Sequence, residues 1–147
     1  LDIDGPPCVC GSSGCFEGMA NADAVVARAQ ELLESGRASA LREAASGGLT
    51  SGDVGLAACR GDEVALDALL AVGRNLGAGL ANISQILDPD VIVIGGGVAE
   101  AGPPLLDPAR EELRARLSDC DFRGPRVVAA ELGETAGVVG AALIAME

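Results

Sequence analysis

A short run of cysteines near the start of the chain, C-V-C-G-S-S-G-C-F-E, constrains the fold more than any other stretch. Its two glycines, Gly11 and Gly14, let the backbone turn tightly between the thiols, because glycine adopts positive φ without steric cost. Three thiolates that converge on one point suit a tetrahedral metal with soft ligands, and zinc is the usual occupant. We therefore predict a structural zinc site whose ligands are Cys8, Cys10 and Cys15.

Two alternatives stay open for this loop. The three cysteines could instead be reduced thiols in a surface loop, although such a cluster is prone to oxidation without a metal. A structural zinc site takes a fourth ligand, commonly His, and the chain has no His. Either the fourth ligand lies outside these 147 residues or the site is incomplete, which is a first indication that the chain is a fragment.

Glu17 follows the last cysteine of the loop by two residues. Its carboxylate could accept hydrogen bonds from a hydroxyl of a substrate. It could equally be an exposed residue in the first turn of the next helix, where a negative charge interacts favourably with the helix dipole. The sequence alone favours neither interpretation.

The charge of the chain limits its partners. It carries 22 acidic residues against 10 basic ones, a net charge of −12. Binding to a phosphate backbone needs clustered Lys and Arg, so we expect this segment not to bind nucleic acid. The start of the chain lacks the basic and apolar regions of a signal peptide, and we expect no membrane span, which would need roughly 20 apolar residues.

The cysteines also indicate a compartment. In a reducing environment, clustered cysteines are more often metal ligands than disulfide partners, so the expected location is the cytoplasm. Cys59 and Cys120 stand apart from the cluster in apolar, helix-like surroundings. For these two residues we predict buried, unreactive thiols.

Hydrophobic periodicity divides the chain into a zinc loop over residues 1–20, a helical segment over 21–87 and a βαβα segment over 88–147. In the helical segment, helices are predicted over residues 21–34, 38–45, 52–59 and 62–87. Gly73 and Gly77 lie one turn apart in the longest helix. An exposed helical glycine costs about 1 kcal/mol, so this pair predicts that another backbone approaches the helix closely.

The βαβα segment contains two apolar runs, Val91–Ile94 and Arg126–Ala130, which predict parallel strands covered on both faces. Between them, Asp107 is expected to cap a helix that has Pro108 at its first position. A final helix is predicted over residues 135–146, where small residues would again allow close packing. The alternation of strands and helices indicates an α/β fold with right-handed crossovers.

Gly95, Gly96 and Gly97 follow the first predicted strand. Ligands of open α/β sheets bind at this end of the strands, and a backbone without side chains can approach a nucleotide closely. The alternative is a plain tight turn, because Glu100 stands where the third glycine of a G-x-G-x-x-G motif would be. Without His the chain cannot form a Ser-His-Asp or Cys-His catalytic system, and no convincing general base is found in it.

Three motifs together resemble the ROK family, which comprises bacterial sugar kinases and sugar-responsive repressors. The cysteine run resembles the family's zinc signature C-x-C-G-x-x-G-C-x-E. The stretch D-P-D-V-I-V-I-G-G-G-V resembles its strand and glycine turn beside the nucleotide, and L-G-E-T-A-G-V-V-G-A-A-L resembles its C-terminal helix. The three motifs occur in the family's order and span nearly the whole chain, with the glucokinase type as the most similar group.

The resemblance implies an actin-like (ribonuclease-H-like) ATPase fold, in which two α/β lobes surround a cleft. This chain would be part of the C-terminal lobe, with parallel strands flanked by helices and a zinc loop. By resemblance, Cys8, Cys10 and Cys15 bind zinc, Glu17 contacts sugar hydroxyls, and the turn Gly95–Gly97 lies against ATP. The phosphate loop and the catalytic aspartate of the family would lie in an N-terminal lobe outside this chain. So would an E-G-H motif whose His would be the fourth zinc ligand.

The resemblance therefore implies the C-terminal part of an ATP-dependent sugar kinase, with glucose as the expected hexose and with ATP and Mg²⁺ as cofactors of the full-length protein. The chain alone is expected to be inactive. The alternative is the effector-binding half of a ROK transcriptional repressor, and a third interpretation is a zinc-stabilised interaction module without a small ligand.

Two further expectations concern the sugar and the assembly. After Glu17 the chain reads G-M-A-N, where family kinases often have an aromatic residue followed by A-S-G, so the sugar stays open. An α/β lobe that lacks its first hairpin would expose the edge of its sheet. We therefore expect the chain to form a homo-oligomer.

Overall fold

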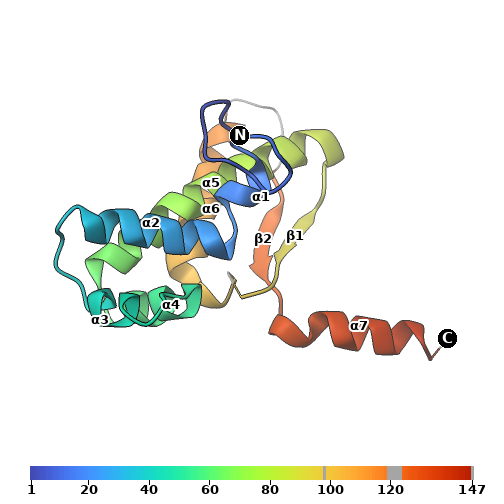
Figure 1. The fold of residues 1–147 in the computed structure, drawn as a ribbon. Coiled ribbons are helices and arrows are strands. Elements are labelled where there is room, and N and C mark those ends of the chain that lie inside the picture. Colours follow the sequence, from blue (N-terminus) through green and yellow to red (C-terminus); the bar gives the residue numbers. More distant parts are fainter. Residues whose placement is uncertain (98, 119–123, 147) are drawn as a thin grey trace.

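The structure, a computed structural model, describes residues 1–97, 99–118 and 124–146 (Figure 1). Within these residues, helices form most of the fold and two strands form a small parallel sheet. In chain order the elements are α1 (Phe16–Met19), α2 (Ala22–Glu34), α3 (Leu41–Ala45), α4 (Ser51–Cys59), α5 (Glu63–Leu87), β1 (Val91–Ile94), η1 (Ala99–Ala101), α6 (Pro103–Leu117), β2 (Arg126–Ala129), η2 (Gly133–Thr135) and α7 (Ala136–Ile144). The α/β class with parallel strands is confirmed.

The long helix α5 is the centre of the fold, and α6 packs along it. A Cβ atom built on Gly73 would lie 2.5 Å from the carbonyl oxygen of Leu105, and one built on Gly77 would collide with that of Ala109. The close backbone approach predicted from these glycines is therefore present. Because successive turns of α5 meet successive turns of α6 in the same order, the two helices run parallel.

Helices α2 and α4 cover another side of α5, and each begins at a side-chain cap. Asn21 accepts a hydrogen bond from Ala24 N at the start of α2. At α4, Thr50 and Asp53 form a reciprocal capping box, one residue earlier than the sequence indicated. The shared core consists of small aliphatic side chains, among them Val25, Ala29, Val54, Val64, Ala68, Leu69 and Leu105.

The two strands pair in parallel, with Val91 opposite Arg126 and Val93 opposite Val128. Only one face of this sheet is covered by the residues that the structure describes. Ile92 and Ile94 pack against the core, whereas Val93 is 59% exposed on the other face. The prediction of strands covered on both faces is therefore wrong for this chain. An unbroken β-branched run is typical of a strand covered on both faces, but among the described residues only the inner face of β1 is covered.

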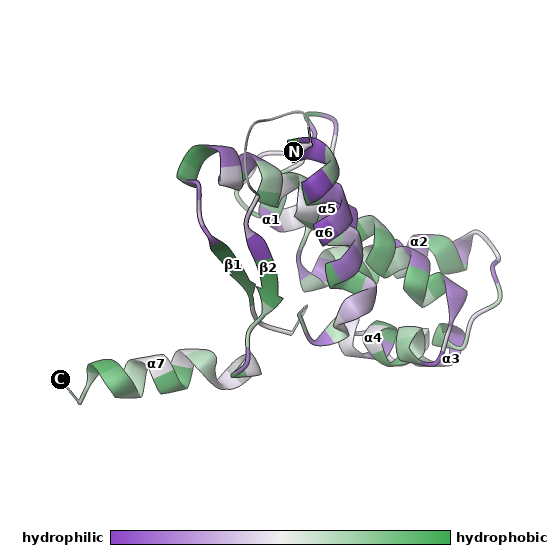
Figure 2. Ribbon diagram, turned by 180° about the vertical axis from the view of Figure 1, so that it is seen from behind, coloured by the Kyte–Doolittle hydropathy of each residue, from purple (hydrophilic) through white to green (hydrophobic). Residues whose placement is uncertain are grey.

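The final helix α7 projects away from the body of the molecule (Figure 1). None of its residues is buried, and Cβ atoms built on Gly137 and Gly140 would meet nothing within 4 Å. The helix is present where it was predicted, but the close packing expected from its small residues is not. In Figure 2 the ribbon of α7 is coloured as hydrophobic along most of its length.

Helix α6 starts earlier than expected. Its first residue is Pro103, preceded by Gly102 with φ 65°, and Pro108 lies inside the helix. Asp107 is therefore not a cap, and its carboxylate instead accepts a hydrogen bond from Arg110 at 2.8 Å. Proline is tolerated at the first positions of a helix, so a helix can begin at Pro103 as well as at Pro108. The sequence prediction chose the later of these two prolines as the start of the helix, and the structure has the earlier one.

The isolated cysteines were predicted to be buried. Cys59 is exposed, which contradicts that prediction. It is the last residue of α4, where the chain turns at Arg60 and Gly61 on the surface. Cys120 lies outside the described residues.

Helix α5 is long and apolar enough to cross a membrane by length and composition. However, 67% of its most apolar window is buried inside the protein, as in the core helix of a globular domain.

Candidate functional site

The cysteine loop is held in a compact shape by its own backbone. Pro7 and Ser13 form an antiparallel bridge, and Cys8 N donates to Ser12 O at 2.8 Å. Gly11 and Gly14 have φ values of 87° and 60°, as the tight turns require. A Cβ atom on Gly14 would also collide with the carbonyl oxygen of Asp2, so this position needs glycine for two independent reasons.

This loop brings the three predicted ligands together. The sulfur atoms of Cys8, Cys10 and Cys15 all lie within 4.8 Å of one another, and the Sγ atoms of Cys10 and Cys15 are 3.4 Å apart. In a tetrahedral site with zinc–sulfur bonds of about 2.3 Å, the sulfurs would be about 3.8 Å apart. The donor set therefore fits a soft, tetrahedral metal ion and leaves a fourth position for another ligand.

The mutual contact of the thiols separates their pKa values. A hydrogen bond from the Ser12 backbone lowers the pKa of Cys10, and hydrogen bonds from the Cys15 and Cys8 side chains lower it further. The same contacts raise the pKa of Cys15 to about 11, because Cys15 donates to its neighbours and becomes a like charge when it ionises. The cluster therefore favours the thiolate form at Cys10 and disfavours it at Cys15.

The loop leads directly into α1, which is fixed against α5. The ring of Phe16 lies on Gly79, where a Cβ atom would overlap the ring. The Nδ2 atom of Asn75 donates to Met19 O at 3.2 Å and ties down the end of α1. Sequence reasoning did not identify this anchor. The available signal was Gly79, a third glycine in a helix whose other two glycines had already indicated close contacts.

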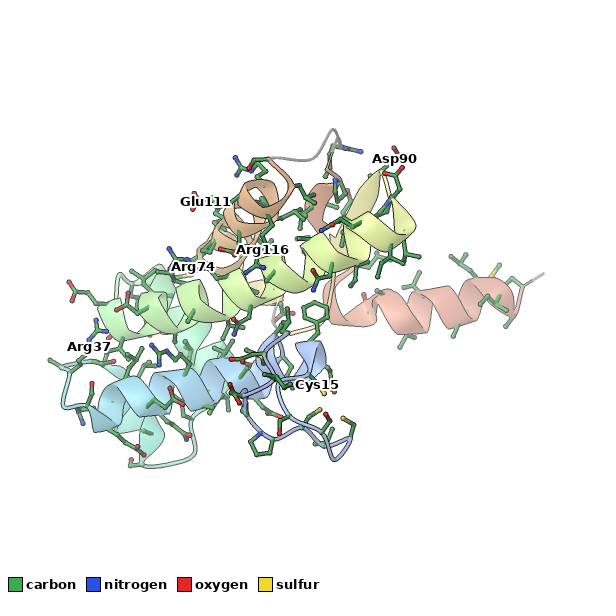
Figure 3. The ribbon with its side chains drawn as sticks, turned by 90° about the horizontal axis from the view of Figure 1, so that it is seen from above. Cys15, Arg37, Arg74, Asp90, Glu111 and Arg116 are labelled. Carbon is green, nitrogen blue, oxygen red and sulfur yellow. The ribbon has the colours of Figure 1, made fainter. Side chains whose placement is uncertain are left out.

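Glu17 lies in the first turn of α1 and is exposed. Its carboxylate makes no hydrogen bond or ion pair with another residue in the part of the chain that the structure describes. The backbone around it is fixed by the cysteine loop on one side and by Phe16 on the other. Glu17 is therefore an open acceptor on a supported turn. In Figure 3, the labelled Cys15 marks the start of α1, which lies beside α5.

The Gly95–Gly97 turn follows β1 and is exposed. Gly96 has φ 77°, and its carbonyl oxygen accepts a hydrogen bond from Ala99 N at 3.0 Å, so the turn leads into η1. In Figure 1 this turn lies beyond the lower end of β1, whereas the cysteine loop lies beside the opposite end of the strands. The chain therefore carries two separate candidate regions and does not bring them into one pocket.

Known proteins are similar to this chain in sequence and in fold. The chain matches the family model described as ROK family over residues 1–147. It is 37% identical to a glucokinase of Streptomyces coelicolor, covering 98% of this chain and 47% of that protein. It is 28% identical to the DNA-binding transcriptional repressor Mlc of Escherichia coli, covering 98% of this chain and 35% of the repressor.

A solved structure agrees with the sequence relatives. A ROK family glucokinase from Streptomyces griseus, solved in complex with glucose and AMPPNP, superposes with a TM-score of 0.82 at 35% identity. The match covers 98% of this chain and 48% of that protein, so the chain spans about half the length of such relatives. Since the family model covers every residue, the chain belongs to the ROK family.

Proposed function

We propose that this chain is the zinc-loop half of an ATP-dependent sugar kinase, with glucose as the sugar. The observation that carries the proposal is the placement of Glu17, an exposed carboxylate in the first turn of the helix that directly follows three converging thiols. The similarity to glucokinases of two Streptomyces species supports a sugar kinase rather than another use of the same loop. The half of the relatives that this chain does not match would supply the catalytic base and the phosphate loop.

Cys8, Cys10 and Cys15 would hold the zinc ion, with a fourth ligand from outside this set. Zinc in such a thiolate site is structural and supplies a cross-link rather than a reactive water. In this chain, the cross-link would fix the loop from which α1 begins. The carboxylate of Glu17 would then accept hydrogen bonds from two neighbouring sugar hydroxyls, which positions the sugar for phosphoryl transfer.

The exposed turn Gly95–Gly97 would lie against the nucleotide, in the position where open α/β sheets bind ligands. Its three residues carry no side chains that would keep a phosphate or ribose away from the backbone. ATP with Mg²⁺ would bind there in the complete kinase, part of an actin-like ATPase fold. Positioning of the two substrates and neutralisation of phosphate charge would account for most of the acceleration. We propose a cytoplasmic location, where ATP is available.

A second candidate function rests on the similarity to the repressor Mlc. In this alternative, the same half binds a sugar or a sugar phosphate as an effector, without turnover. The acidic charge of −12 concerns only this segment and is compatible with both candidates, because DNA would be contacted elsewhere.

Binding measurements separate the two candidates. We would load the purified chain with zinc and measure its binding of glucose and of a non-hydrolysable ATP analogue by equilibrium dialysis. For a kinase half, glucose binding should fall at least tenfold in Glu17→Gln, and nucleotide binding should fall in Gly96→Val while glucose binding is kept. Glu31→Gln is the matched control, since Glu31 is an exposed carboxylate that pairs with Arg28 on α2.

Sugar binding without any nucleotide binding would favour the repressor half. Zinc binding without sugar or nucleotide binding would contradict both functions and leave an interaction module. Metal content is measured separately, and Cys10→Ser should lower it below one zinc per chain.

A further inference from the structure

Two thiols of the cysteine loop, those of Cys10 and Cys15, lie in direct contact, with their Sγ atoms 3.4 Å apart. That distance is shorter than the separation of about 3.8 Å in a tetrahedral zinc site and longer than the bond of about 2.05 Å in a disulfide. To reach either arrangement, the two sulfur atoms need to move by less than about 1.5 Å relative to each other. The pair can therefore serve as metal ligands or form a bond with each other.

The backbone of the loop brings these two cysteines together without a covalent link. Gly14 N donates to Pro6 O at 2.8 Å and folds the chain back just before Cys15. Between Cys10 and Cys15, Gly11 and Gly14 both have positive φ and make the short return path possible. A disulfide across this segment therefore needs no new path of the backbone.

Exposure distinguishes the three thiols of the cluster. Cys10 is exposed, whereas Cys8 and Cys15 are partly buried. The Cys8 sulfur lies over α1, where a Cβ atom built on Gly18 would be 3.8 Å from it. An oxidant dissolved in water therefore reaches Cys10 most readily, and the thiol in hydrogen-bond contact with Cys10 is that of Cys15. An accessible thiol beside a second, resolving thiol is typical of redox-sensitive cysteine pairs.

We propose that Cys10 and Cys15 form a redox switch, which hydrogen peroxide closes into a disulfide. The Cys10 sulfur attacks one oxygen of the peroxide and the O–O bond breaks, so that Cys10 becomes a sulfenic acid and the other oxygen leaves as water with the thiol proton. The Cys15 sulfur then attacks the sulfenic sulfur, the S–S bond forms, and the hydroxyl group leaves as a second water with the Cys15 proton. Two thiols and one peroxide thus give one disulfide and two waters, and a dithiol reductant reverses the change.

Closing the disulfide and binding a metal exclude each other. A metal takes its sulfur ligands as thiolates, and the disulfide removes two of the three sulfur donors, which leaves Cys8 alone in the cluster. One thiolate does not make a structural zinc site, which needs four ligands. Oxidation therefore releases bound zinc, and bound zinc slows oxidation because the metal holds the sulfur atoms. This metal-dependent part rests on the zinc site of the proposed function, whereas the disulfide itself does not.

The test begins with the reduced, metal-free chain and one equivalent of hydrogen peroxide. Every sample carries Cys59→Ser and Cys120→Ser, so that only the thiols of the cluster can react. The intact mass should fall by about 2 Da, the mass of two hydrogen atoms. Peptide mapping by mass spectrometry should find Cys10 joined to Cys15, and dithiothreitol should restore the reduced mass. Circular dichroism checks that the chain and its variants fold.

Three matched variants assign the roles of the thiols. In metal-free Cys8→Ser, which keeps the pair, the disulfide should still form. When Cys15→Ser is added, no resolving thiol remains, so Cys10 should stop at the sulfenic acid and be captured by dimedone. When Cys10→Ser is added instead, the remaining Cys15 should react with peroxide about tenfold more slowly, because it is less accessible.

In the zinc-loaded chain, a coloured chelator should report one zinc released for each disulfide formed, and the oxidised chain should take up no zinc. A disulfide that joins Cys8 to either other thiol would overturn the inference, as would oxidation of Cys10 to sulfinic acid in place of a disulfide. So would a disulfide that forms while zinc stays bound. A reduced chain that binds no zinc would instead contradict the proposed zinc site, and the mapped disulfide would still decide whether the switch exists.

Discussion

Helices α5 and α7 have a similar content of small and aliphatic residues but opposite environments. Both are rich in glycine, alanine and aliphatic residues. In α5, Gly73 and Gly77 lie against the backbone of α6, whereas Gly137 and Gly140 of α7 face open space. Small residues in a helix therefore permit a close contact, but they do not by themselves show that a contact is made within the described residues.

Substitution of matched glycines would give the largest difference between the two helices. Gly77→Ala should destabilise the chain by about 2 kcal/mol, because the new methyl group meets the Ala109 carbonyl oxygen and forces two backbones apart. Gly140→Ala should instead stabilise the chain by up to about 1 kcal/mol, because an exposed helical glycine is replaced by a better helix former and the new methyl group meets nothing. Urea denaturation followed by circular dichroism measures both, at two protein concentrations so that any contribution of association is detected. Equal losses at the two positions would contradict the difference in packing.

Substitutions at the first residues of α5 and α7 should also differ in their effect on the free energy of unfolding, but by a smaller amount. Asp62 caps α5 by accepting from Ala65 N at 3.0 Å, and it also accepts from Ser39 and Ala40. The start of α7 at Thr135 has no side-chain cap. Asp62→Asn should cost about 1 kcal/mol, because the remaining hydrogen bonds lose the negative charge. Thr135→Ala should cost less than about 0.5 kcal/mol.

The same carboxylate gives a pH dependence. Burial raises the pKa of Asp62, but hydrogen bonds from Ala65 N, Ala40 N and Ser39 outweigh it, so its pKa lies below the ordinary value of 3.8. Its stabilisation is therefore complete above that value and is lost as the pH falls from there through the lower pKa of the folded state. Denaturation at a series of pH values should show this loss for the parent chain and a smaller loss for Asp62→Asn. Identical profiles would exclude Asp62 as the source.

A surface ion pair on α6 should contribute least to the free energy of unfolding. Arg116 Nε lies 2.7 Å from Glu112 Oε1 on the outside of α6, with the arginine side chain 51% exposed. Arg116→Ala should cost about 0.3–0.5 kcal/mol and less at high salt. A loss as large as that of Gly77→Ala would mean that charge, rather than backbone contact, holds α6 in place. Denaturation at two salt concentrations measures the effect.

Local patterns predicted much of the fold, because their physical causes act within a few residues. The helices predicted over residues 21–34 and 62–87 and the two parallel strands follow from local rules, and the structure agrees with each. The predictions that failed concern what lies on the far side of an element. Burial of Val93 and of Cys59 depends on neighbours distant in sequence, which neither residue type nor spacing specifies.

In the candidate site, too, the local features were predicted from the sequence and the contacts between distant residues were not. Spacing within one loop was enough to expect the sulfur atoms of Cys8, Cys10 and Cys15 close together, and they lie within 4.8 Å of one another. The anchor of that loop was not predicted, because Phe16 and Gly79 are 63 positions apart in the sequence. Whether zinc, sugar and nucleotide bind at these residues stays a prediction.

The packing of the Phe16 ring against Gly79 also restricts which residues can occupy these two positions. Any side chain at position 79 would displace the ring, and a smaller residue at position 16 would leave a cavity beneath α1. Neither position can change alone without moving the cysteine loop relative to α5. Among family members we therefore expect these two positions to co-vary, so that a chain with alanine or serine at 79 carries a smaller residue than phenylalanine at 16.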